Sequence, residues 1–210
     1  TTQTYEGIFQ AGTSTSAQGL SIGNTTTANV IAFYYTNNDL ALLSTQVLRD
    51  VSAWYHIVVA LDTTQATADN RLRIYLNGSE ITTWTTNNRA TAFSQNSDQS
   101  INNNIQHIIG NYSGSISSSY SPNGYLTEVN FIDGQALTPS SFGMTDPQTG
   151  AWIPIKYSGT YGTNGFYLNF KDATSTTTLG YDYSGNSNNW TTNNFSVTAG
   201  TGNDSLTDVP

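Results

Sequence analysis

The residues that could carry catalysis are few and poorly spaced for it. The chain has three glutamates, Glu6, Glu80 and Glu128. Glycoside hydrolysis needs two carboxyl groups about 5 Å apart, or somewhat further apart for inversion. Glu128 and Asp133 are separated by an odd number of positions, which places them on opposite faces of a strand. We therefore expect a protein that is not an enzyme.

The sequence offers two kinds of metal ligand. His56 and His107 each lie in an apolar segment without a neighbouring Cys, Glu or second His, so we interpret both as hydrogen-bonded structural histidines. Asp182, Asn186 and Asn188 share one short loop and offer the carboxylate and amide oxygens that Ca²⁺ prefers. The same residue types also build turns held by their own side-chain hydrogen bonds. A calcium site and a hydrogen-bonded turn are both open interpretations of this loop.

Aromatic side chains beside amides and hydroxyls form a third group of candidate site residues. Tyr112 and Tyr120 flank a stretch rich in Gly and Ser. Trp84 lies shortly before one Asn-Asn pair, and Trp190 directly follows another. Exposed rings in such polar surroundings suit an uncharged sugar, which stacks on the ring and hydrogen-bonds to its neighbours. We predict these four residues as ligand-binding, with packing in or around the core as the alternative for each ring.

The charge balance restricts the class of partner. Six Lys and Arg face 14 Asp and Glu, for a formal net charge of -8. Nucleic acids and anionic membrane surfaces are bound through clustered cations, so we expect neither as a partner. The chain has no apolar run of about 18 residues, so we expect no membrane insertion. It has no cysteine, which excludes a disulfide framework and a thiolate metal site. An uncharged glycan fits this composition, although the same residues are common in strands and loops.

The elements that must position these residues are predicted to be β-strands. Residues 30–35 are β-branched and aromatic. Residues 54–61 (WYHIVVAL) are apolar on both faces, which predicts a central strand covered on both sides. Residues 72–76 alternate with period two, which predicts one buried face, and they run into the hairpin signal Asn77-Gly78. No long amphipathic helix is evident. The pattern predicts an all-β fold, an antiparallel β-sandwich.

Three segments resemble the laminin-G-like, concanavalin A-like jelly-roll domains. Residues 54–78 contain W-x-H, then Asp62, then the string R-I-Y-L-N-G, as the central strands of that family do. Residues 124–137 (GYLTEVNFIDGQAL) are similar to the family's closing strand. Residues 182–188 (DYSGNSN) are similar to its D-x-S-G-N-x-N loop. The resemblance implies a jelly-roll sandwich that works by binding at its surface.

Two departures from the family pattern bear on the domain organisation. Thr127 stands where the family usually has the Asp that helps to hold calcium, which puts a calcium site at that position in doubt. The 182–188 loop follows the closing strand, whereas it usually opens the domain. The domain is then circularly permuted, or the residues after about 160 begin a second sandwich or return to the first. We favour packing on the first, because about 50 residues are too few for a separate jelly roll. The expected organisation is a jelly-roll core at 1–150, strands and a loop packed on it at 151–197, and a linker or tail at 198–210.

Residues 47–210 also resemble, as longer strings, virion-associated proteins of marine bacteriophages. This resemblance implies a location on the virion surface, outside the cell, in a tail fibre, spike or capsid decoration. It implies host-surface glycans or other virion proteins as partners, and a homo-oligomer, because fibre proteins are usually symmetric.

Two functions follow from these expectations. The first is a glycan- or receptor-binding module of a virion appendage, with exposed aromatic side chains at its site. The second is a structural decoration or assembly domain without a sugar ligand, whose sheet edges pair with neighbouring chains. The one cofactor expected is Ca²⁺, in the 182–188 loop.

Overall fold

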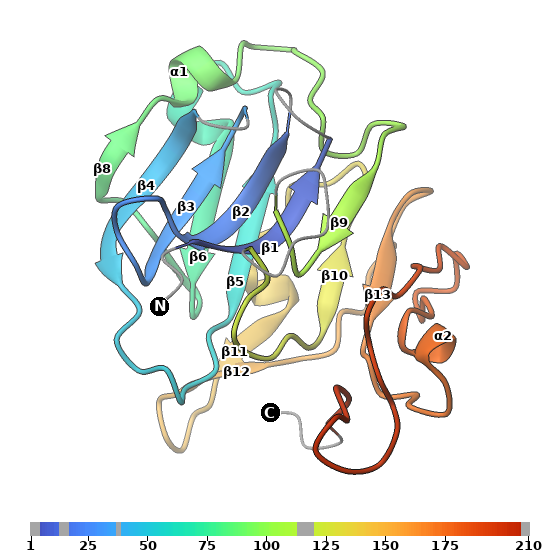
Figure 1. Ribbon diagram of the computed structural model, residues 1–210. Helices are drawn as coiled ribbons and strands as arrows, with labels where there is room; N and C mark the ends of the chain where they lie inside the picture. Colours follow the sequence, from blue (N-terminus) through green and yellow to red (C-terminus); the bar gives the residue numbers. More distant parts are fainter. Residues whose placement is uncertain (1–4, 13–16, 37–38, 113–119, 207–210) are drawn as a thin grey trace. The chain divides into compact units, whose positions relative to one another are not determined.

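Antiparallel strands supply most of the regular structure, as the alternating apolar residues predict (Figure 1). The computed structural model describes residues 5–12, 17–36, 39–112 and 120–206. In these ranges no helix has both the length and the apolar character that a membrane span requires. The helices within the described ranges are single turns: α1 (Arg89–Ala92), α2 (Thr176–Leu179), η2 (Ala68–Asn70) and η3 (Pro139–Ser141).

The chain forms two compact units, and the first contains a six-stranded sheet, a three-stranded sheet and the two-stranded hairpin β11–β12. This first unit comprises Thr1–Gly124 and Thr138–Lys156. Its larger sheet has six strands in the order β8-β4-β3-β2-β1-β9. Their bounds are β1 (Tyr5–Ala11), β2 (Gln18–Gly23), β3 (Val30–Tyr34), β4 (Leu40–Val47), β8 (Trp84–Asn87) and β9 (His107–Ile109). The smaller sheet has the order β5-β6-β7, with bounds β5 (Ile57–Leu61), β6 (Leu72–Leu76) and β7 (Ser79–Glu80).

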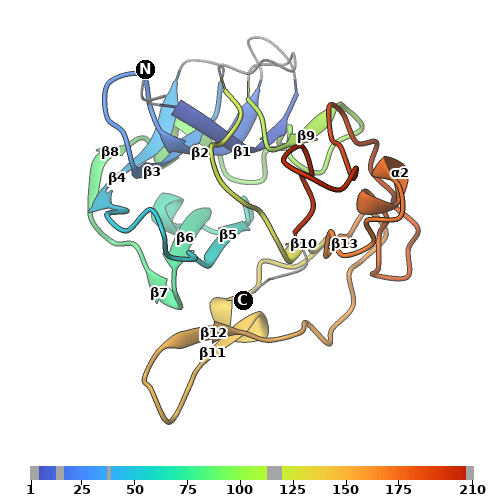
Figure 2. The same ribbon diagram turned by 60° about the horizontal axis from the view of Figure 1, so that its bottom comes forward.

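The two sheets stack face to face and enclose the core, which makes this unit an antiparallel β-sandwich (Figure 2). Ile31 and Phe33 of β3 meet Leu72 and Ile74 of β6 in one apolar cluster. The hairpin between β6 and β7 turns at Asn77-Gly78, with φ of 47° and 82°. Both values lie in the left-handed region that this dipeptide tolerates, so the predicted hairpin is confirmed.

The prediction for the smaller sheet needs two corrections. β5 is covered on both faces, as its apolar residues predict, but it lies at the end of the three-stranded sheet and not at its centre. β6 was expected to bury one face, yet Tyr75 on its other face is also buried, packed with Val58 and Ala60 against Phe142. The residues around η3 form an extra layer there. The alternation of apolar residues within one strand does not show whether another segment will cover the second face of that strand.

His56 has a structural role in the first unit. A hairpin of β11 (Gly143–Thr145) and β12 (Trp152–Pro154) places the Trp152 indole beside it, and Trp152 Nε1 donates to His56 Nδ1 at 3.0 Å. A Cβ at Gly78 or Gly143 would lie 2.4 or 2.6 Å from the indole, so only glycine fits at either position. This hydrogen bond requires an unprotonated Nδ1. Burial correspondingly lowers the pKa of His56 from its usual value.

The second unit comprises Tyr125–Leu137 and Tyr157–Pro210. Its two strands, β10 (Val129–Phe131) and β13 (Phe166–Leu168), pair antiparallel, and α2 follows β13 (Figure 1). It therefore takes β10 from the segment expected to belong to a 1–150 core. The packing of residues 151–197 on the sandwich stays a prediction. In the expected linker, Ser205 is buried and its hydroxyl donates to the Phe170 carbonyl at 3.4 Å, while residues 207–210 lie outside the described residues.

Candidate functional site

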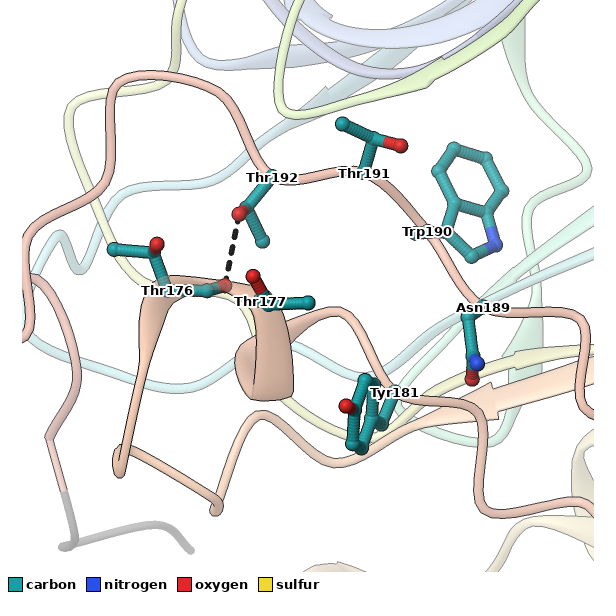
Figure 3. A pocket seen from close by; sticks show the side chains of 7 residues that line it. All are labelled: Thr176, Thr177, Tyr181, Asn189, Trp190, Thr191 and Thr192. Atoms are coloured by element: carbon teal, nitrogen blue, oxygen red, sulfur yellow. Dashed lines mark hydrogen bonds between the residues drawn. The ribbon is translucent and has the colours of Figure 1, made fainter.

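A pocket of about 310 Å³ in the second unit brings aromatic rings, hydroxyls and an amide together. Thr176 and Thr177 of α2 form one side, opposite the segment 189–192 (Figure 3). One of the predicted ligand-binding residues, Trp190, is part of it. The complete lining is Thr176, Thr177, Tyr181, Asn189, Trp190, Thr191 and Thr192.

Local hydrogen bonds fix the threonine side of the pocket. Ser175 caps α2: its hydroxyl accepts from the Thr178 N–H, and the Thr178 hydroxyl accepts from the Ser175 N–H. This capping box satisfies N–H groups that a helix start leaves without partners. Across the pocket, the Thr192 hydroxyl donates to the Thr176 carbonyl at 2.8 Å, a bond visible in Figure 3. The two walls are therefore connected directly.

The aromatic wall depends on a close backbone approach. The backbone N–H of Trp190 donates to the Gly180 carbonyl at 2.7 Å, and a Cβ at Gly180 would lie 2.1 Å from the Trp190 carbonyl oxygen. The Trp190 ring packs edge-on against Phe166, with centroids 4.9 Å apart. Phe166 in turn stacks on Phe131 at 5.3 Å. The strand pair β10–β13 thus sets the position of the indole.

Two polar groups at the pocket complete its chemistry. Asn189 Oδ1 accepts the Asp182 N–H at 2.9 Å, which orients the amide. Asn189 Nδ2 makes no hydrogen bond to any other described residue, so it can donate to a ligand. Tyr181 is 40% exposed, and its ring is open to solvent. None of the seven lining side chains carries a carboxylate, an imidazole or a cation.

The predicted calcium loop forms a hydrogen-bonded turn next to this pocket. Each carboxylate oxygen of Asp182 accepts two hydrogen bonds, at 2.8–2.9 Å. Oδ1 accepts from the Tyr167 and Ser184 N–H groups, and Oδ2 accepts from the Asn188 N–H and the Ser184 hydroxyl. Burial raises the pKa of Asp182, but these donors outweigh burial and the net pKa is below its usual value. The carboxylate is therefore ionised, and both of its oxygens are engaged in hydrogen bonds within the protein.

The two asparagines of the loop also use their side chains internally. The Asn186 amide donates to the Gly162 and Gly165 carbonyls at 2.6 and 2.8 Å. The Asn188 amide donates to the Thr163 and Gly165 carbonyls at 3.0 and 2.9 Å. A calcium ion needs oxygen ligands directed at one point. Here Asp182 accepts from N–H and O–H donors, while the asparagines direct their NH₂ groups elsewhere, so this arrangement does not fit a calcium site. Within the described residues, no cluster of three or more His, Cys, Asp and Glu could hold a metal ion.

The other predicted ligand-binding aromatics lie in the first unit, where neighbouring residues cover most of their surface. Tyr112 is 2% exposed, in a cluster with Val30, Tyr34 and Leu43, so it offers no face to a sugar. Tyr120 packs on the edge of the same cluster, and residues 113–119 between the two lie outside the described residues. Trp84 packs against the core between the sheets, and the Arg89 guanidinium lies 5.7 Å from its ring centroid.

The carboxylate of Glu128 is also engaged within the second unit. Glu128 Oε2 accepts the Tyr167 hydroxyl, and Oε1 lies 3.3 Å from Lys171 Nζ. Burial and then the hydrogen bond to Glu128 raise the pKa of Tyr167. Burial likewise raises the pKa of Tyr161, to about 12. Both phenols therefore stay protonated at neutral pH and act as hydrogen-bond donors.

Sequence reasoning missed Tyr181 and the four threonines of the pocket. Tyr181 directly precedes the D-x-S-G-N loop, and that adjacency is the signal that could have found it. The threonines gave no signal, because a chain so rich in Thr contains many such runs. No family model, curated protein or solved structure matches the chain. The resemblance to laminin-G-like and phage virion proteins therefore stays a prediction from the motifs.

Proposed function

We propose that this protein is a non-catalytic, surface-binding module and that it binds a glycan in the pocket beside Tyr181 and Trp190. The observation that carries the proposal is the lining itself: two aromatic rings among hydroxyls and one amide. Aromatic faces suit the C–H faces of sugars, and Thr and Asn side chains can both donate to and accept from sugar hydroxyls. The lining lacks the paired acids that glycoside hydrolysis uses, which favours binding over turnover.

The pocket is also held in place before any ligand arrives. The Thr192–Thr176 hydrogen bond, the capping box of α2 and the packing of Trp190 on Phe166 all form within the protein alone. Binding to such a site orders few side chains, so little of the interaction energy is lost to entropy. Its volume of about 310 Å³ lies at the small end of ligand pockets.

The proposal extends to the biological setting through the sequence resemblance alone. We place the protein on a phage virion surface, outside the cell, as a part of a tail fibre, spike or decoration. Its partners are then host-surface glycans, and its assembly state is a homo-oligomer. The net charge of -8 disfavours nucleic acid and anionic membranes as partners.

A second candidate function is a structural decoration or assembly domain of the virion, and one observation favours it. The hairpin β11–β12 and the residue after it expose Met144, Ile153 and Ile155, at 45%, 38% and 40% of their surfaces. Met144 and Ile153 are directly paired across the hairpin. Neighbouring exposed apolar side chains mark a contact surface more often than isolated ones do.

A glycan array with the full chain tests the first function. We expect wild-type protein to bind at least one glycan and Tyr181→Ala to lose that binding. Tyr181→Ala is a mild change, because the only hydrogen bond of Tyr181 among the described contacts is from its backbone N–H to Thr178. Tyr125→Ala is the matched control, since Tyr125 is 68% exposed in the same unit and does not line the pocket. Absence of glycan binding by the wild type, or equal binding by Tyr181→Ala, would reject this proposal.

A further inference from the structure

We infer that the ligand is a linear chain of uncharged sugars and that Tyr183 forms a second stacking subsite beside the pocket. This inference rests on the proposed function, because it extends the same site. Tyr183 does not line the pocket, and it is 46% exposed, slightly more than Tyr181 at 40%. The two tyrosines are two positions apart in the chain, and both are exposed.

The backbone between the two tyrosines sets their direction. Tyr183 N–H donates to the Tyr167 carbonyl, and Asp182 Oδ1 accepts the Tyr167 N–H, both at 2.8 Å. The segment thus lies along β13 with the Asp182 side chain turned toward that strand. Asp182 turns toward β13, so we infer that the side chains on either side of it project away from that strand, as alternate residues do on extended backbone. Their spacing is then about 6–7 Å along the chain. That spacing is comparable to one sugar unit, so successive units of one glycan can contact the two rings.

The same contacts hold the backbone that carries the two rings. The Asp182 carboxylate accepts four hydrogen bonds, and Asn189 accepts the Asp182 N–H. Neither tyrosine therefore depends on a mobile backbone for its position. Tyrosine has only two side-chain torsions, so stacking on a ring at a fixed backbone position costs little conformational entropy.

Charge decides the chemical class of the sugar. The pocket lining has no cation, and the one carboxylate between the tyrosines is occupied by its own hydrogen bonds. Lys171 of the second unit pairs with Glu128. An anionic sugar would meet no cation of the lining and a protein with a net charge of -8. An uncharged glycan meets no such repulsion.

A length series of one neutral glycan, from monosaccharide to hexasaccharide, tests the inference by titration calorimetry. The series is chosen from the glycans that wild-type protein binds on the array. We expect Tyr183→Ala to weaken binding of the longer members about 5- to 10-fold, the worth of one aromatic contact, and to leave the monosaccharide unchanged. Tyr181→Ala weakens every member, and Tyr125→Ala weakens none.

The outcomes separate this inference from the proposed function. Equal affinity of Tyr183→Ala and wild type across the whole series would overturn the second subsite while leaving glycan binding in place. Equal weakening of the monosaccharide and the hexasaccharide would overturn it as well, since Tyr183 would then act within the first subsite. Wild-type binding to anionic glycans alone would overturn the uncharged class. Wild-type binding to no glycan at all would reject the proposed function together with the inference.

Discussion

Replacing Asp182 by Asn is the most informative perturbation of the second unit. It removes the negative charge and one of the two acceptor oxygens while keeping the shape of the side chain. The carboxylate connects three parts of the chain: β13 through Tyr167, its own turn through Ser184, and the end of the loop through Asn188. An amide has one oxygen, so it can serve only one of the two pairs of donors. Its NH₂ group must face the other pair.

The magnitude follows from counting those bonds. If the amide oxygen keeps Tyr167 and Ser184 N–H, the NH₂ group opposes the Asn188 N–H, while the Ser184 hydroxyl can rotate to accept. One bond to a charged acceptor is then lost, worth about 1.5–3 kcal/mol, and the remaining bonds lose their charge assistance. Because Asp182 is only half-buried, we expect a total loss of about 2–3 kcal/mol in the free energy of unfolding.

Urea denaturation of the full chain and amide hydrogen exchange together measure this effect. Exchange should accelerate at Asn188 in Asp182→Asn, because that N–H loses its acceptor. Asp172→Asn is the matched control: its Oδ1 accepts from the Thr174 N–H and hydroxyl, which an amide oxygen can also do. We expect the control to change stability by less than about 0.5 kcal/mol. Equal stability of Asp182→Asn and the control would refute the reasoning.

The pH dependence and the response to calcium provide two further checks on Asp182. Since the pKa of Asp182 is below its usual value, its contribution to stability is complete above that value and disappears as pH falls through the folded-state pKa. The difference between wild type and Asp182→Asn should therefore shrink in acid. Neither CaCl₂ nor EDTA should shift the wild-type Tm. A calcium-dependent rise in Tm that Asp182→Asn lacks would show that the carboxylate exchanges its N–H partners for the ion.

Three more perturbations follow from single contacts. Wild-type Tm should fall as pH drops below about 6.5, because His56 then binds a proton more readily in the unfolded state than in the folded state. His56→Gln should make Tm less dependent on pH in this range. An unchanged pH dependence would contradict the role of the Trp152–His56 hydrogen bond. Gly180→Ala should lower the free energy of unfolding by about 1–3 kcal/mol in urea titrations, since its Cβ collides with the Trp190 carbonyl, and a neutral effect would argue against this close approach. Arg71→Lys should cost about 2–3 kcal/mol by the same assay, because one ammonium cannot reach the three backbone carbonyls that the guanidinium contacts; full stability would contradict this.

Features with a local cause were predicted correctly from the sequence. Asn77-Gly78 forms its hairpin because only a few residue types accept positive φ at both turn positions. Residues 30–34 form β3, as their β-branched and aromatic side chains predict. These properties depend on neighbouring residues, and a sequence states those directly.

The candidate site was predicted in part. Trp190 lies in the pocket, but a ring beside Asn residues gave no information on which neighbours would enclose it. Tyr112 had the same sequence features and became buried, because β3 and β4 bring Tyr34 and Leu43 against it from far along the chain. The ring centroids of Tyr112 and Tyr34 are 5.3 Å apart. Exposure of an aromatic ring is thus decided by contacts that no local pattern encodes.

The sequence by itself determined the class of the fold, the absence of clustered cations and the scarcity of acids for catalysis. Only the tertiary structure showed which hydrogen bonds the 182–188 loop makes, because the partners of Asp182 and Asn186 include backbone groups 15 to 24 residues away. It also decided which aromatic rings reach solvent. The physical reason is the same in both cases: a side chain's composition fixes what it can bind, whereas the folded chain fixes which of those bonds remain open to a partner.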